Sequence, residues 1–370
     1  MKIIHSFTNQ DTLQQTDTAI IACFTGRRKV LSTAAYNGGY REDLKWVFNQ
    51  DYKHDYKSLD NPENGRKSDP DFHGMKAPTF SEHMRIVAFD LGLDPSRSCG
   101  LTTAADMDNV SIQSMSYADT TVTAVVTGGI DVNGGRAGDR AEWHETLGSF
   151  VFAPGTINIL LFIDADLTES ALAQAMVTSA EAKAAATQEL LAPSRYSTGI
   201  ATGSGTDGII IISDSESPVK LTSAGKHCKL GELIGRTVIA AVKEALFLQT
   251  QLGAAQQFSI LRRMDRFHVT EASIWESIPQ GGLSYPDFCA YLHGIASEPT
   301  LVVLTSLYAH LLDQLQWGLL DTHNVFISVK SLLEQMGMDS DTLTENQDHE
   351  KMIVIMVKVY EKGIGKLACI

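Results

Sequence analysis

The sequence predicts a mixed α/β fold, a mixed β-sheet core packed by helices, followed by a mostly helical C-terminal extension. Short β-branched or apolar runs recur through the first 250 residues or so, at 121–127, 159–163 and 209–212. Two long stretches of helical periodicity separate or follow them, at 166–191 and 230–252. From about Phe258 the sequence has few glycine-rich loop motifs, and helical patterns dominate. We therefore expect a core over 1–254 and a helical extension over 255–370.

The first elements are two strands at 18–23 and 29–32, which Gly26-Arg27-Arg28 would join as a hairpin. A short helix is expected over 79–91, ended by Gly92. Asp166 and Glu169 form a capping-box pattern for the helix that ends before Pro193.

The later elements are mainly helices. In the 230–252 segment, Leu230, Ile234, Val238, Ala241 and Ala245 fall on one apolar face. Further helices are predicted over 299–320 and 325–336, whereas residues 352–357 fit either a strand or the start of a helix.

Composition narrows the class of protein. The chain has 370 residues and a net charge of −14, without a basic run, which argues against nucleic-acid binding. No stretch approaches the roughly 18 apolar residues of a membrane span. The five cysteines are scattered and form no C-x-x-C pair, so neither a disulfide framework nor a zinc site is indicated. We expect a cytoplasmic protein, with no metal ligands that can be named from spacing.

Residues 201–208 carry the densest cluster of chemistry-bearing groups, just before the strand at 209–212. Thr202, Ser204 and Thr206 are candidate nucleophiles, and Asp207 could orient one of them or accept a proton. The intervening glycines let backbone N–H groups approach a ligand. The alternative is a tight turn in which the hydroxyls cap backbone groups.

Three other positions have both a functional and a structural interpretation. Thr156 and Asn158 alternate around Ile157, so they would share the polar face of a strand that lines a pocket or meets solvent. His227 precedes a helix and suits general acid–base chemistry, or it is a surface residue. Glu181 lies on the polar side of its helix and would serve a site only if that side faces the cleft.

The order of these motifs resembles one family, the adenosylcobinamide amidohydrolases of corrinoid salvage, over roughly residues 17–252. Ser204 stands where a second threonine is expected, and neither the polar insert after Asn49 nor the chain beyond about 255 has a counterpart. The matching residues are Leu31-Ser32-Thr33-Ala34, Asn37-Gly38-Gly39, Gly100-Leu101-Thr102-Thr103-Ala104, Val126-Thr127-Gly128-Gly129 with Asn133, Gly138-Asp139, Gly155-Thr156-Ile157-Asn158, Glu181-Ala182-Lys183, Ala201 to Asp207, and Gly225-Lys226-His227 to Gly235.

The resemblance implies a hydrolase that cleaves the amide between the aminopropanol arm and the corrin ring of adenosylcobinamide. The products would be adenosylcobyric acid and aminopropanol, with the corrinoid as substrate and no established cofactor. It implies catalytic roles for Thr202, Ser204, Thr206, Asp207 and His227. Substrate-binding roles would fall to Asn37, Gly38, Thr102, Thr156, Asn158 and Glu181.

Two alternatives stay open at this point. The chain could be a non-catalytic corrinoid-binding module, although it has no convincing cobalt-ligating histidine motif. It could also be another amide-cleaving enzyme that matures by self-cleavage before a threonine, since Gly155-Thr156, Ala201-Thr202 and Gly205-Thr206 are small-residue–threonine junctions. A homo-oligomer is equally open.

Overall fold

The computed structural model describes residues 1–52, 76–141, 144, 155–279 and 281–369. The chain forms two compact units. The first comprises Met1–Ala192 and Ala201–Leu252, and the second comprises Pro193–Ile200 and Gly253–Ile370. Most of the polar insert after Asn49 lies outside the described residues. The mixed α/β class and the helical C-terminal region agree with the prediction from sequence.

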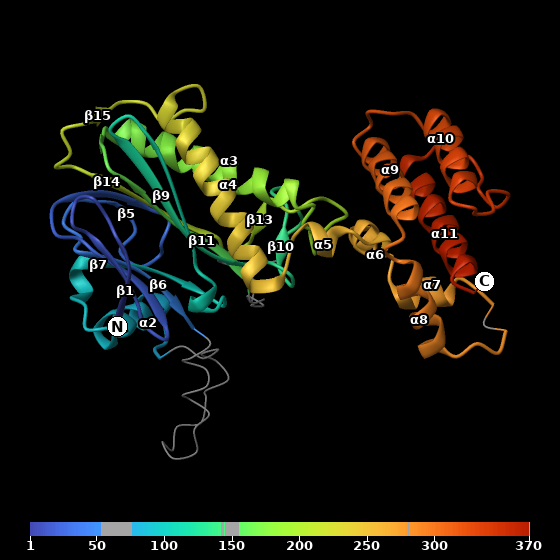
Figure 1. Ribbon diagram of the computed structural model, residues 1–370, viewed down its shortest axis with the longest axis horizontal. Helices are drawn as coiled ribbons and strands as arrows, with labels where there is room; N and C mark the ends of the chain where they lie inside the picture. Colours follow the sequence, from blue (N-terminus) through green and yellow to red (C-terminus); the bar gives the residue numbers. More distant parts are fainter. Residues whose placement is uncertain (53–75, 142–143, 145–154, 280, 370) are drawn as a thin grey trace, which may run out of the picture. The chain divides into compact units, whose positions relative to one another are not determined.

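The first unit is built on two β-sheets of mixed strand direction (Figure 1). One sheet has the order β1 (Lys2–Ser6), β2 (Thr12–Gln15), β3 (Ala19–Cys23), β6 (Trp46–Asp51) and β7 (Ser98–Thr103). The other has the order β5 (Gly39–Arg41), β4 (Arg28–Ser32), β14 (Gly208–Asp214), β11 (Thr156–Ile163), β9 (Thr120–Gly129) and β8 (Ser111–Tyr117). Two short pairs complete it, β10 (Gly134–Gly135) with β13 (Gly203–Ser204), and β12 (Asp166–Leu167) with β15 (Lys220–Leu221).

Four layers result from the packing of these sheets. Helices α3 (Glu169–Glu189) and α4 (Lys229–Thr250) cover one face of the six-stranded sheet through an apolar core that includes Ile159, Ile211 and Val238. The other face of that sheet packs on the five-stranded sheet through residues such as Leu160 and Ile210. Helix α2 (Phe80–Asp90) covers the outer face of the five-stranded sheet. Strands β11 and β14 are buried on both faces, which explains their continuous apolar sequence.

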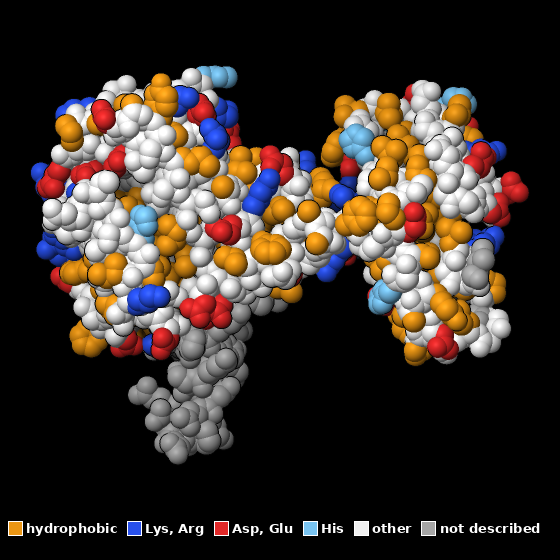
Figure 2. Space-filling view, in the orientation of Figure 1, with side chains coloured by type: hydrophobic (Ala, Val, Ile, Leu, Met, Phe, Trp, Pro, Cys, Tyr) orange, Lys and Arg blue, Asp and Glu red, His pale blue; other side chains and the backbone are white. Residues whose placement is uncertain are grey.

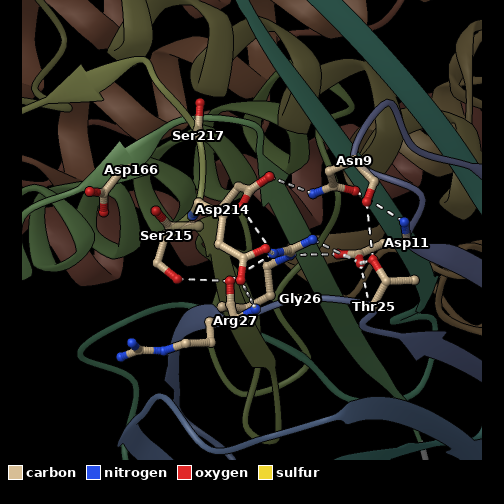
Figure 3. Close-up of polar contacts among 12 residues, drawn as sticks. Asn9, Asp11, Thr25, Gly26, Arg27, Asp166, Asp214, Ser215 and Ser217 are labelled. Carbon is tan, nitrogen blue, oxygen red and sulfur yellow. Dashed lines mark hydrogen bonds and ion pairs between the residues drawn. The ribbon is translucent and has the colours of Figure 1, made fainter.

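The expected hairpin over residues 18–32 is wrong, because β3 and β4 belong to different sheets. Arg28, 1% exposed, explains the separation. It pairs with Asp11 (Nε–Oδ2, 2.7 Å), next to β2, and with Asp214 (Nη1–Oδ1, 2.9 Å), its register partner on β14. Figure 3 shows these carboxylates converging, with Asn9 bonded to Asp214. The cluster joins the two sheets at the end of β14 farthest from Gly208.

The helices lie close to their predicted positions. Helix α4 begins after the N-cap Cys228, and α3 begins after Thr168, whose hydroxyl accepts from Ala171 N. The predicted cap Asp166 is wrong, because its carboxylate pairs with Lys29 instead (2.5 Å).

The second unit is helical in its described part and has its own apolar core, which includes Phe288, Tyr308 and Tyr360. Residues 352–357 lie inside a helix, not a strand. Its helices are α5 (Ala254–Gln257), α6 (Ile260–Met264), α7 (Glu271–Glu276), α8 (Tyr285–Ile295), α9 (Pro299–Gln316), α10 (Thr322–Gln335) and α11 (His349–Leu367).

Surface side chains of all kinds are interspersed on the face shown in Figure 2. Among the described helices none is by itself long and apolar enough to cross a membrane. Within the described part of the chain, α8 and α9 reach that length and composition when they are taken together, and they are bent by 89° at their junction.

Candidate active site

A cavity of about 480 Å³ opens at the N-terminal ends of β11 and β14. These two strands run parallel, with Asn158 opposite Gly208, so both bring their first residues to the same edge. Strand β7 of the other sheet supplies the facing wall. The lining is polar near Thr33, Thr102, Thr103, Thr156, Asn158, Thr206 and Asp207, and apolar near Ala34, Ala35, Phe80, Leu101 and Ala104. A concave site with an apolar wall and a few convergent polar groups is typical of small-molecule binding.

Asn158, 1% exposed, ties the two sheets together beneath the cavity. Its Nδ2 donates to Asn49 Oδ1 and to the Thr102 carbonyl, both at 2.7 Å. Asn49 in turn donates to Thr127 Oγ1 at 2.7 Å. Because the Thr102 carbonyl can only accept, it fixes the orientation of the Asn158 amide. Both N–H bonds are thus used inside the protein, and Oδ1 is the atom that Asn158 can offer a ligand.

Thr156 lies on the same face of β11 as Asn158, as the alternation predicts. Its hydroxyl is 3.4 Å from Asn158 Oδ1 and donates to the Thr206 carbonyl at 2.8 Å. This bond connects the start of β11 to the loop before β14, so Thr156 both lines the cavity and holds the loop.

Asp207 organises the loop before β14. Its Oδ1 accepts from Ile157 N (2.8 Å) and Ser204 Oγ (2.7 Å), and its Oδ2 accepts from Ser204 N (2.9 Å) and Lys183 Nζ. A carboxylate has about four acceptor positions, and all of them are occupied here. Gly203 permits this approach, because a Cβ at its φ of +155° would overlap both Asp207 Oδ2 and Lys183 Nζ. Asp207 is therefore placed to hold the loop rather than to accept a proton.

The three candidate nucleophiles of this loop differ in their surroundings. The Ser204 hydroxyl is one of the donors to the carboxylate just described, and it does not line the cavity. Thr202 Oγ1 accepts from Ala137 N at 3.0 Å, outside the cavity. Thr206 does line the cavity, and its hydroxyl donates to the Gly155 carbonyl at 2.9 Å. Thr206 is the one of the three that a bound substrate can meet.

Four other predicted residues do not line this cavity. Asn37 donates to the carbonyls of Pro95 (2.9 Å) and Ser98 (2.8 Å), and its φ of 51° fits a turn residue. Gly38 packs against the Ala34 carbonyl, where no side chain would fit. Both shape the chain behind the cavity wall.

His227 and Glu181 lie on the surface of the first unit. His227 is exposed in the turn that leads into α4. Glu181 pairs with Lys226 at 2.5 Å, and their side chains are 47% and 63% exposed. The site role considered for Glu181 required its polar side to face the cleft, and here it faces the Lys226 turn.

Lys183 and His83 are among the residues at the site that were not assigned to it from the sequence. Lys183 belongs to the Glu-Ala-Lys motif, and its helical position, two residues from Glu181, turns it toward Asp207. His83 lines the cavity from α2 and is only 3% exposed. Its Nδ1 accepts from Lys76 N at 3.1 Å, which places the proton of the neutral ring on Nε2. No sequence pattern around His83 marks it.

Cys99 precedes the cavity-lining Gly100, yet it does not resemble a reactive thiol. It is fully buried, and burial raises the pKa of its thiol. Among the described residues, no group of three or more His, Cys, Asp or Glu side chains could hold a metal ion.

Comparison with known proteins places this site in a family. Residues 3–254 match the adenosylcobinamide amidohydrolases. The chain belongs to this family. The adenosylcobinamide amidohydrolase match covers the first unit from residue 3 onward, with strands of both sheets, and it begins before residue 17, where the resemblance in the motifs begins.

Two individual proteins were also similar. An uncharacterized protein of Methanocaldococcus jannaschii, MJ1613, is 32% identical over 263 residues, which are 68% of this chain and 94% of that protein. The crystal structure of the PH0078 protein from Pyrococcus horikoshii covers 66% of this chain and 80% of its own, with 13% identity and a TM-score of 0.31.

Proposed function

We propose that this protein hydrolyses the amide between the aminopropanol arm and the corrin ring of adenosylcobinamide, giving adenosylcobyric acid and aminopropanol. The observation that carries the proposal is the family match over residues 3–254, which includes every residue that lines the cavity. The corrinoid is substrate and no resident cofactor is invoked. We propose a cytoplasmic location for this reaction.

Amide hydrolysis requires a nucleophile, donors for the developing oxyanion, and a proton for the leaving amine. Thr206 is the favoured nucleophile or water-orienting group, because it lines the cavity and is the one of the three candidate hydroxyl residues of this loop that does so. His83 suits the role of donor to the oxyanion or the leaving amine, because it lines the cavity and its Nδ1 accepts from Lys76 N. The Lys183–Asp207 pair and Asn158 position these groups without reacting.

The test is incubation of purified full-length protein with adenosylcobinamide, followed by mass spectrometry of the corrinoid and an assay for free aminopropanol. A new carboxylate on the corrinoid and equimolar aminopropanol are expected. A matched preparation of Thr206→Ala separates catalysis from contaminating activity. If the native protein binds the corrinoid tightly but returns it unchanged, it is a binding module and the proposal is wrong.

A further inference from the structure

The segment Pro193–Ile200 lies within the first unit in sequence but belongs to the second unit in space. Its ends are closed by a bridge between Pro193 and Ile200, and Ser194 N donates to the Gly199 carbonyl at 2.9 Å. The chain therefore leaves the first unit after Ala192, makes this small loop, and returns at Ala201.

Polar contacts from the helical unit hold the tip of this loop. Arg266 Nη1 donates to the Thr198 carbonyl at 2.7 Å, and Thr198 Oγ1 donates to Gln316 Oε1 at 2.8 Å. Arg195 pairs with Asp265 at 3.0 Å. Side chains that lie before α7 and at the end of α9 thus bond to two residues of this segment, Arg195 and Thr198, which are distant from them in sequence.

Arg266 is itself held by Asp313 in a two-pronged pair, with Nη2 and Oδ2 2.5 Å apart and side chains 8% and 6% exposed. A buried ion pair contributes little net stability, because desolvation of the two charges offsets their attraction. Its geometric effect is larger, since a guanidinium fixed by a bidentate carboxylate presents its remaining N–H bonds in one direction. That direction is the Thr198 carbonyl.

The other side of the loop runs directly into the candidate active site. Ala201 N donates to Ala192 O (2.8 Å), and the Ala201 carbonyl accepts from Thr187 Oγ1 (2.7 Å). Thr202 N then donates to Gly135 O at 2.9 Å, and Ser204 N bonds to Asp207. Ala201, Thr202 and Ser204 each make a backbone hydrogen bond in these contacts. A displacement of Ile200 would therefore be passed on to this loop, because its backbone has few unbonded residues that could change conformation instead.

We infer that the helical unit positions the catalytic loop, with Arg266 as a positioning residue that acts through Thr198 and the Pro193–Ile200 segment. This inference goes beyond the proposed function. Its kinetic test rests on the proposed function, whereas its hydrogen-exchange test does not. The helical unit then has a role in turnover although none of its described residues lines the cavity.

The experiment uses the full chain with both buried charges replaced, Arg266→Met with Asp313→Leu, so that neither is left unpaired. The control is Thr305→Val with Tyr360→Phe, which removes another buried polar contact of the same unit (2.8 Å) that does not touch the segment. For each protein we would measure kcat and KM for adenosylcobinamide and the hydrogen exchange of the amides in residues 201–207 and in α9.

The Arg266/Asp313 variant should lose roughly 10-fold in kcat, with KM within about twofold, a size typical of coupling through packed elements. Amides of residues 201–207 should exchange faster, while those of α9 stay protected. The control should match the native protein in all four measurements.

Unchanged loop exchange in the Arg266/Asp313 variant overturns the inference, and so does an equal effect in the control, which would indicate general loosening of the helical unit. If the native protein does not hydrolyse adenosylcobinamide, the proposed function fails, yet the exchange measurement still decides whether Arg266 positions the loop.

Discussion

Lys183 and Asp207 form an ion pair in which the side chains are only 13% and 8% exposed, and the carboxylate simultaneously accepts two backbone N–H bonds. The pair connects α3, β11 and the loop before β14. Removal of one partner would leave the other charge buried and the loop without its central acceptor.

Asp207→Asn should therefore lower turnover by roughly 100-fold or more, the size expected when positioned groups are lost. It should also destabilise the fold by about 3 kcal/mol, because Lys183 is left unpaired. Lys183→Met combined with Asp207→Asn should recover the part of the stability that the unpaired Lys183 costs, because the amide oxygen can still accept a backbone N–H bond, but it should not recover the activity. Thermal denaturation and kcat of the three proteins check this. Near-native turnover in the double variant would show that the pair has no part in organising the site.

Thr206→Ala should lower kcat by roughly 100-fold while the corrinoid still binds, because a reacting hydroxyl acts mainly in the transition state. Thr202→Ala is the matched control, since Thr202 does not line the cavity and its hydroxyl accepts from Ala137 N. Steady-state kinetics and equilibrium binding of adenosylcobinamide give the answer. The assignment of Thr206 fails if the two variants lose activity in the reverse order.

His83→Phe should lower turnover by roughly 10- to 100-fold by removing a donor within the cavity. His227→Phe, on the exposed turn before α4, should leave turnover within about twofold. Both variants are assayed beside the native protein, with circular dichroism as a check of folding. A loss confined to the His227 variant would return the acid–base role to that residue.

Arg28→Met should destabilise the protein by about 3–5 kcal/mol, because Asp11 and Asp214 are left buried without their counter-charge. At a temperature where the variant is folded, its KM should equal that of the native protein, since Arg28 lies at the far end of β14 from the cavity. Urea denaturation and kinetics test the two statements separately. A stable variant with a raised KM would contradict both.

Asp164 gives a prediction for pH. Burial raises the pKa of its carboxyl, although Thr121 N donates to it at 2.5 Å. The folded state thus binds this proton more tightly than the unfolded state does. Its stabilising contribution is present below the unfolded pKa, about 3.9, and is lost as the pH rises through the folded pKa.

Asp164→Asn removes this loss. The Tm of the variant should exceed that of the native protein at pH 7, and the difference should shrink as the pH falls toward 4. A Tm difference that is constant over this range would show that the carboxyl does not titrate with a raised pKa.

Local patterns in the sequence were sufficient to predict much of the fold. The apolar face of α4 and the continuous apolar runs of β11 and β14 are patterns within single segments, and the structure has these elements where the patterns predict them. The supposed hairpin at 18–32 failed for a long-range reason. Arg28 is drawn to Asp214, 186 residues away, and no local pattern carries that pairing.

The site shows the same division. Thr156 and Asn158 follow from strand alternation, and Thr206 and Asp207 from a glycine-rich loop before a strand. Lys183 and His83 lie in helices, where polar side chains usually face solvent. That these two side chains face the site depends on how the helices pack on the sheets, which the sequence alone does not give. The catalytic and substrate-binding roles of all of these residues stay predictions.

The excursion of Pro193–Ile200 into the helical unit also sets an order of events during synthesis. Thr198 is separated from Arg266 by 68 residues and Arg266 from Asp313 by a further 47. At roughly 5–20 residues per second, the loop tip waits about 3–14 seconds for Arg266 to be made, and longer for the carboxylate that fixes it. Both sheets are complete by then. The loop that carries Thr206 would therefore settle only after Arg266 and Asp313 have been made, later than the two sheets on which the cavity is built.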